Sequence, residues 1–149
     1  MSYLVKDYMH TQLLTVDVGV SVLDVSKLMA EKGVGYAIAL EKKKPAGIVT
    51  EKDLVLKVMA KEKNPSTMRV SEVMSTPLVT VDLDATLEDA VKTMAKHQIR
   101  RLPVTKNNVI YGVFTSRDLT RHFSDYEDKV AKDLISACAL YNNTVDLGF

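Results

Sequence analysis

Two heptapeptides of one pattern decide the fold of this chain: GIVTEKD at residues 47–53 and GVFTSRD at residues 112–118. In each, a glycine and two apolar residues precede a threonine, and an aspartate stands three positions after that threonine. The apolar run favours a strand, and the Thr-x-x-Asp spacing is typical of a helix N-terminus. Each heptapeptide therefore predicts a junction from strand to helix.

The heptapeptides belong to a longer internal repeat. Residues 5–55 align on residues 70–120 with a constant offset of 65 and no gap, and 15 of the 51 aligned positions are identical. Solenoids need three or more units, so two copies instead predict a closed pair related by pseudo-twofold symmetry. We expect neither copy to be stable alone.

Each copy has the pattern of a β-α-β-β-α unit, which predicts an α/β (α+β) fold. Ser21 and Thr86 are expected helix N-caps, each followed three residues later by an aspartate and then by apolar residues at helical spacing. The expected strands are 13–16, 36–40 and 46–50 in the first copy, and 78–81, 102–105 and 109–115 in the second. A second helix is expected after each heptapeptide.

The predicted organisation is one compact module. Repeat 1 covers residues 1–60, and a charged linker with a proline covers 61–69. Repeat 2 covers 70–123. Residues 124–149 are expected to form a C-terminal helix and tail outside the repeat.

Composition narrows the class of protein. Of 149 residues, 46% are hydrophobic and 26% are charged, as in an average soluble globular chain, and the net charge of +1 makes nucleic acid an unlikely partner. The longest apolar stretch, residues 34–40, is far short of the roughly 20 residues that span a bilayer. A lone cysteine, Cys138, and the lack of a signal-peptide pattern predict a cytoplasmic protein without membrane insertion.

The other candidate groups indicate structural roles. The three histidines, His10, His97 and His122, lack neighbours at metal-ligand spacings, so we predict surface or packing roles and no metal. Cys138 is interpreted as a packing residue. Lys42–Lys44 is interpreted as a solvated hairpin turn, because no aromatic residues are interleaved with the lysines.

The two heptapeptides allow two interpretations. A strand-to-helix junction favours an anion, and an aspartate can accept two hydroxyl protons from a vicinal diol, so ribose phosphate fits the pattern. The alternative is a capping box that needs no ligand. Two further boxes, Ser21/Asp24 and Thr86/Asp89, lack the preceding strand and are interpreted as caps only.

Together with the string IRRLPV at residues 99–104, the repeated unit and its heptapeptides resemble the cystathionine β-synthase (CBS) domain family, as a tandem pair. The resemblance covers about residues 5–123. It implies a compact module with two symmetry-related clefts between the repeats. Many tandem pairs of this family bind adenosine-containing ligands in these clefts.

The resemblance also implies a set of site residues. Asp53 and Asp118 would hold ribose hydroxyls, and Thr50 and Thr115 would contact ribose or phosphate. The remaining implied ligand contacts are Ser116, the phosphate-neutralising residues Lys52, Arg100, Arg101 and Arg117, and the residues near adenine, Val16, Val81 and Pro103. The first copy reads VGYAIA at residues 34–39, without the arginines and the proline, so we expect the stronger nucleotide site at Asp118.

The predicted function is that of a stand-alone regulatory sensor. AMP, ADP, ATP or S-adenosylmethionine would act as a regulatory ligand and not as a cofactor, and the module would signal to an unidentified effector protein. A homodimer is the expected assembly. No nucleophile–base pair, catalytic acid pair or metal set points to an enzyme. The alternative is a ligand-free dimerisation or scaffold module.

Overall fold

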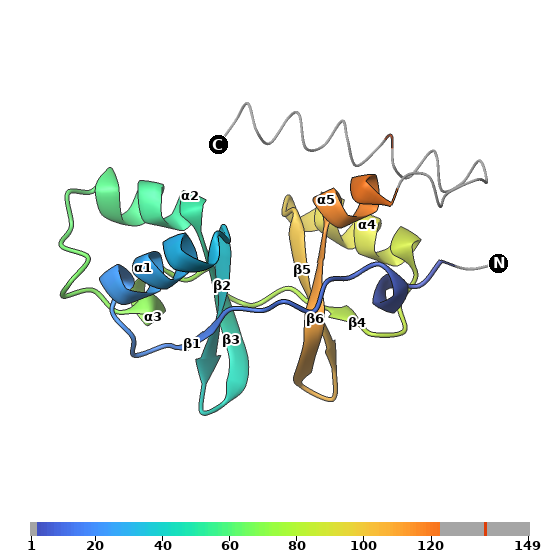
Figure 1. The fold of residues 1–149 in the computed structure, drawn as a ribbon, viewed down its shortest axis with the longest axis horizontal. Helices are drawn as coiled ribbons and strands as arrows, with labels where there is room; N and C mark the ends of the chain where they lie inside the picture. Colours follow the sequence, from blue (N-terminus) through green and yellow to red (C-terminus); the bar gives the residue numbers. More distant parts are fainter. Residues whose placement is uncertain (1–2, 123–135, 137–149) are drawn as a thin grey trace. The chain divides into compact units, whose positions relative to one another are not determined.

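The computed structural model describes residues 3–122 and Ser136 (Figure 1). The expected C-terminal helix and Cys138 lie outside the described residues. The chain forms two compact units: unit 1 contains Met1–Gln12 and Val79–Phe149, and unit 2 contains Leu13–Leu78. These units are offset from the sequence repeats, because the first residues of each repeat pack with the strands of the other repeat.

Unit 2 is built on a three-stranded sheet. Its order is β1-β2-β3, with β1 parallel to β2 and β2 antiparallel to β3. The helices lie on one face of this sheet (Figure 1). In chain order the elements are β1 (Thr15–Asp17), α1 (Val22–Lys32), β2 (Tyr36–Glu41), β3 (Lys44–Thr50), α2 (Glu51–Leu54), the π-helical segment η2 (Val55–Met59) and α3 (Val70–Val73).

Unit 1 repeats this topology with the sheet order β4-β5-β6. Its elements are the 3-10 turn η1 (Val5–Asp7), β4 (Val81–Asp82), α4 (Leu87–His97), β5 (Arg101–Lys106), β6 (Val109–Thr115) and α5 (Ser116–Arg121). The predicted α+β fold with two β-α-β-β-α repeats is confirmed. The short helix α3 was not predicted, because four residues are too few to show a helical period.

The predicted caps begin the two long helices. Ser21 Oγ accepts a hydrogen bond from the Asp24 amide at 3.0 Å, and Thr86 Oγ1 accepts one from the Asp89 amide at 3.1 Å. Both helices end on a left-handed residue, Gly33 after α1 and Gln98 after α4. Each helix is therefore delimited by local sequence at both ends.

Each unit has its own hydrophobic core, centred on the middle strand of its sheet. In unit 2, Ala37, Ile38 and Ala39 of β2 are fully buried. In unit 1, Leu102 of β5 and Phe114 of β6 are fully buried and pack in the core of that unit. These cores position the ends of β3 and β6, where the two heptapeptides lie.

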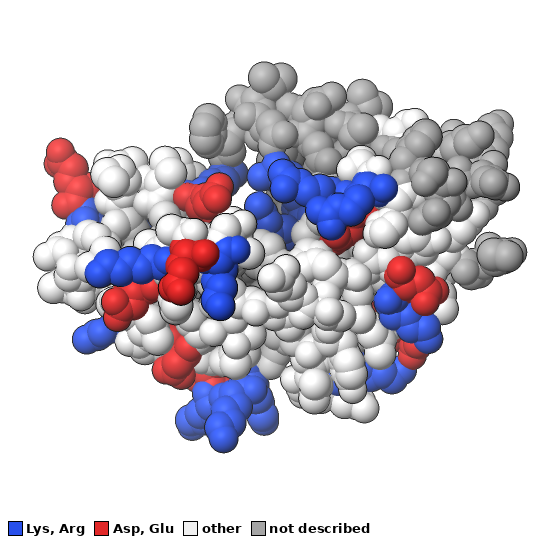
Figure 2. Space-filling model, in the orientation of Figure 1, with Lys and Arg blue, Asp and Glu red and all other residues white. Residues whose placement is uncertain are grey.

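The β2–β3 turn carries the lysine run of the sequence. Lys42 and Lys43 are exposed and adopt positive φ angles of 50° and 65°. Figure 2 shows basic side chains gathered at the tip of this hairpin. The interpretation of these lysines as a hairpin turn is confirmed. Within the described part of the chain, no helix has the length and apolar character needed to cross a membrane.

An exposed ion-pair cluster in unit 1 makes stability depend on pH. Asp84 accepts hydrogen bonds from Lys106 and Lys6, which lower its pKa from 3.8 to about 2. A carboxylate with a depressed folded-state pKa contributes stability above its unfolded value, here about 3.8, and loses that contribution as the pH falls through about 2. Asp84→Asn is therefore expected to melt below the wild type at pH 5.

Thermal melts of both proteins between pH 5 and pH 2 check this expectation. The difference in melting temperature should shrink as the pH approaches 2, and 1 M salt should reduce it at pH 5 by screening the exposed charges. A difference that persists unchanged at pH 2 would assign the effect to something other than these ion pairs.

Candidate functional site

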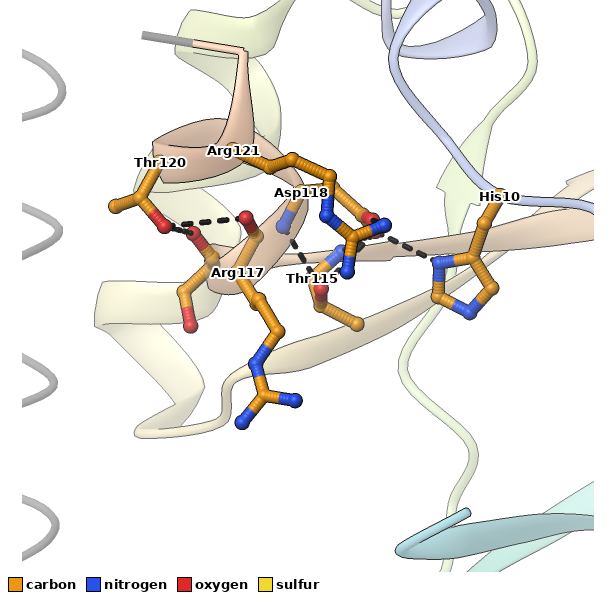
Figure 3. A network of polar contacts seen from close by, with 7 residues as sticks. His10, Thr115, Arg117, Asp118, Thr120 and Arg121 are labelled. Atoms are coloured by element: carbon orange, nitrogen blue, oxygen red, sulfur yellow. Dashed lines mark hydrogen bonds and ion pairs between the residues drawn. The ribbon is translucent and has the colours of Figure 1, made fainter. Parts of the chain in front are cut away.

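The heptapeptide of unit 1 forms a reciprocal capping box at the end of β6 (Figure 3). Thr115 Oγ1 accepts a hydrogen bond from the Asp118 amide at 3.1 Å. In return, Asp118 Oδ2 accepts one from the Thr115 amide and one from the Thr115 hydroxyl, both at 2.9 Å. Asp118 is only 2% exposed, so its carboxylate makes these contacts away from solvent.

The heptapeptide of unit 2 forms the same box at the end of β3. Asp53 Oδ2 accepts from the Thr50 amide at 2.9 Å and from the Thr50 hydroxyl at 3.1 Å, and Thr50 Oγ1 accepts from the Asp53 amide at 3.3 Å. Both heptapeptides therefore cap helices, as one interpretation predicted. Capping occupies Oδ2 of each aspartate and does not involve Oδ1.

The two carboxylates differ in their further partners. Asp53 Oδ1 accepts a hydrogen bond from Ser75 Oγ at 3.0 Å and lies 2.9 Å from Lys57 Nζ. In unit 1, His10 Nδ1 lies 2.9 Å from Asp118 Oδ2, and the nearest cation to Asp118 Oδ1 is Arg121, at 4.0 Å. The His10 tautomer with its proton on Nδ1 would donate this hydrogen bond to the carboxylate.

Sequence reasoning missed His10, Ser75 and Lys57 as parts of these boxes. His10 and Ser75 occupy equivalent positions, since they are 65 residues apart. His10 forms a two-residue antiparallel bridge with Val113, and Ser75 forms the same bridge with Ile48. The offset of 65 residues shows from the sequence that His10 and Ser75 are equivalent. It does not reveal that the segment before each repeat's first strand packs against the box of the other repeat. The expectation of a surface or packing role for His10 omitted its contact with Asp118.

Most of the implied phosphate contacts gather around the box of unit 1. Arg101 pairs with Thr115 across β5 and β6, and the Arg100 carbonyl accepts a hydrogen bond from the Ser116 amide at 3.1 Å. Ser116 is buried, whereas Arg117 is exposed and its side chain extends away from α5 (Figure 3). Lys52 is exposed on α2 beside the box of unit 2.

The implied adenine contacts lie in the sheets. Val16 of β1 and Val81 of β4 are buried in the cores of units 2 and 1, respectively. Pro103 is a buried residue of β5 and pairs with Val113 of β6. The structure thus gives Val16 and Val81 a role in packing, and their contact with adenine stays a prediction.

The two boxes differ strongly in local charge. Four arginines around the box of unit 1, Arg100, Arg101, Arg117 and Arg121, correspond to Gly35, Tyr36, Lys52 and Leu56 around the box of unit 2. The second lysine of the box of unit 2, Lys57, corresponds to His122. An anionic ligand is therefore favoured at the box of unit 1. No group of three or more metal-ligating side chains occurs among residues 3–122 and Ser136.

Topology and boxes together define a tandem pair of small α+β units, each with a buried aspartate at a strand end. The CBS domain family model matches residues 5–60 and 70–125. The chain belongs to the CBS domain family, whose tandem pairs are regulatory ligand-binding modules.

Curated relatives agree with this assignment. The chain is 39% identical over 115 residues to the CBS domain-containing protein YhcV of Bacillus subtilis, covering 77% of this chain and 81% of YhcV. It is 38% identical over 99 residues to the uncharacterized protein MK0525 of Methanopyrus kandleri. That match covers 65% of this chain and only half of MK0525.

Solved structures share the fold. The hexameric CBS-CP12 protein from bloom-forming cyanobacteria matches with a TM-score of 0.77 and 26% identity, over 94% of this chain and 98% of that one. The CBS domain pair of protein MJ0100, solved in complex with 5′-methylthioadenosine and S-adenosyl-L-methionine, matches with a TM-score of 0.75 and 23% identity. This second match covers 85% of this chain and all of that chain.

Proposed function

We propose that this chain is a regulatory module that binds an adenosine-containing ligand and signals to a partner protein. The ligand class comprises AMP, ADP, ATP and S-adenosylmethionine, acting as regulators and not as cofactors. The observation that carries the proposal is the state of the Asp118 carboxylate. Its Oδ2 is fully engaged in the capping box, while its Oδ1 accepts no hydrogen bond from the described residues.

A ribose diol matches this carboxylate. An ionised carboxylate offers about four lone-pair positions, two on each oxygen, so Oδ1 of Asp118 can accept both hydroxyl protons of a diol. The arginines around the box would neutralise phosphates attached to the same ribose. The MJ0100 domain pair supports the ligand class, because two adenosine compounds occupy a protein of this fold.

Signalling requires a partner, and a second copy of the chain is the first that we propose. Val55, Leu56 and Met59 of η2 are 47%, 44% and 77% exposed, which leaves an apolar strip on unit 2. The CBS-CP12 neighbour, which is hexameric, supports self-assembly of a chain with this fold. A ligand that favours one arrangement of a dimer would change what the effector protein contacts. In this proposal the module acts in the cytoplasm and catalyses no reaction.

The alternative function, a ligand-free dimerisation or scaffold module, is favoured by one observation. Both capping boxes are complete without a ligand, so neither aspartate needs a ribose to explain its burial. The two functions make opposite predictions for a thermal-shift experiment on the full chain.

The sensor function predicts a rise in melting temperature with AMP, ADP, ATP or S-adenosylmethionine and none with GMP. At a hundredfold excess over its dissociation constant, a ligand specific for the native state adds about 2.7 kcal/mol to the free energy of unfolding. Asp118→Ala is expected to abolish this rise, because it removes both the diol acceptor and the anchor of the box.

Asp89→Ala is the matched control for the thermal shift. Asp89 follows a threonine N-cap at the same spacing, but it is exposed and lies at the start of α4. It should lower the melting temperature slightly and leave the ligand-induced rise intact. A wild-type chain that no adenosine ligand stabilises would favour the scaffold function.

A further inference from the structure

We propose that Lys57 closes the box of unit 2, so that the chain carries one ligand site, at Asp118, and not two. This inference rests on the proposed function, because it concerns which of the two boxes can receive the ligand. It makes Lys57 the residue that determines the ligand stoichiometry of the chain.

The acceptor positions of Asp53 are all occupied within unit 2. Oδ2 accepts two hydrogen bonds from Thr50, and Oδ1 accepts one from Ser75 and forms an ion pair with the Lys57 ammonium at 2.9 Å. Both oxygens of Asp53 are thus engaged by partners within unit 2, three hydrogen-bond donors and one ammonium. A ribose hydroxyl could therefore bind Asp53 only by displacing one of the four donors.

Lys57 is the donor most costly to displace. Its ammonium lies 2.9 Å from Asp53 Oδ1 and also donates to the Val73 carbonyl at 2.8 Å, which anchors it at two points. The Asp53 side chain is 8% exposed, so a neutral hydroxyl that replaced the ammonium would leave a buried charge without its counter-ion. Lys57 lies four residues after Asp53, so the helical turn from α2 into η2 places the two side chains next to each other.

The position of unit 1 that corresponds to Lys57 is His122. Its ring packs edge-on against Tyr8, with ring centroids 5.6 Å apart. Asp118 Oδ1 has Arg121 at 4.0 Å, beyond hydrogen-bond distance, so both lone pairs of this oxygen can accept a ligand hydroxyl. The Oδ1 atom is thus paired with a lysine ammonium at 2.9 Å in unit 2, whereas in unit 1 its ion-pair partner among the described residues is Arg121 at 4.0 Å.

Isothermal titration of the full chain with AMP and, separately, with S-adenosylmethionine measures the stoichiometry. The expected result for the wild type is one ligand per chain. Lys57→Met keeps an unbranched side chain of similar length but removes the ammonium, which frees a position on Oδ1 for a ribose hydroxyl beside the Ser75 hydroxyl, and it is expected to raise the stoichiometry to two. Lys57→Arg is the matched control, since it keeps a cation beside Asp53 and should stay at one. Adding Asp53→Asn to Lys57→Met should abolish the second site.

A measurement on the wild type keeps the test independent of how Lys57→Met folds. Amide chemical shifts should move around residues 115–118 on addition of the ligand and stay constant at residues 50–53. Two sites in the wild type, shifts at both boxes, or a folded Lys57→Met chain with a single site would overturn the closure by Lys57. If neither AMP nor S-adenosylmethionine binds the wild type or any variant, the proposed function is overturned. The closure of a ligand site by Lys57 is then overturned as well.

Discussion

Replacing Phe114 by alanine is expected to lower the free energy of unfolding by about 3–5 kcal/mol. Phe114 is fully buried in the core of unit 1, together with Leu102 of β5 and Leu119 of α5. Removing the ring takes away its apolar burial and leaves a cavity that strands on a common sheet cannot close. Urea denaturation of the full chain, followed by circular dichroism, measures the change.

Tyr111→Ala is the control for Phe114→Ala. Tyr111 lies on the same strand but is 46% exposed, so its truncation should lower the free energy of unfolding by no more than about 1 kcal/mol. Equal losses for both variants would contradict the assignment of Phe114 to the core. Phe114 also precedes Thr115 directly, so we expect the cavity to loosen the box and weaken ligand binding.

The regular parts of the fold could be predicted because they depend on local sequence. Ser21 and Thr86 begin helices through hydrogen bonds to a residue three positions away, and the hairpins follow from short polar turns between apolar runs. Thr115 and Asp118 could be paired for the same reason. In each case the interacting groups are close in the chain, so their spacing carries the information.

The rest of the site could not be predicted because it depends on contacts across the chain. His10 reaches Asp118 over 108 residues, and Ser75 reaches Asp53 over 22. Repeat 1 therefore supplies a side chain to the box of repeat 2, and repeat 2 supplies one to the box of repeat 1. A sequence repeat shows which positions are equivalent but not which copy they contact. Lys57 was missed for a different reason: an i, i+4 ion pair is common on helices and rarely marks a site.

Gly112→Ala tests how the N-terminal segment is held against the box of unit 1. A Cβ at residue 112 would lie 2.6 Å from the His10 carbonyl oxygen and 2.8 Å from Met9 Sδ. The methionine side chain can move by itself, but the carbonyl can move only together with its segment and at the expense of the two backbone hydrogen bonds, 3.1 and 3.0 Å, that His10 and Val113 exchange. We therefore expect the segment to shift outward, with a loss of about 1–3 kcal/mol in the free energy of unfolding.

The outward shift should also separate His10 from Asp118, which an effect on stability alone would not do. Hydrogen exchange of the His10 and Val113 amides is the direct readout, and both are expected to exchange faster in Gly112→Ala. Gly33→Ala is the control, because it costs about 1 kcal/mol through its left-handed φ of 66° while nothing lies within 4 Å of the added Cβ. If both variants accelerate these two amides equally, the close approach at Gly112 is not what holds His10 against Asp118. If only Gly112→Ala accelerates the exchange of these two amides, the absence of a side chain at residue 112 is what allows the N-terminal segment of repeat 1 to pack against the box of repeat 2.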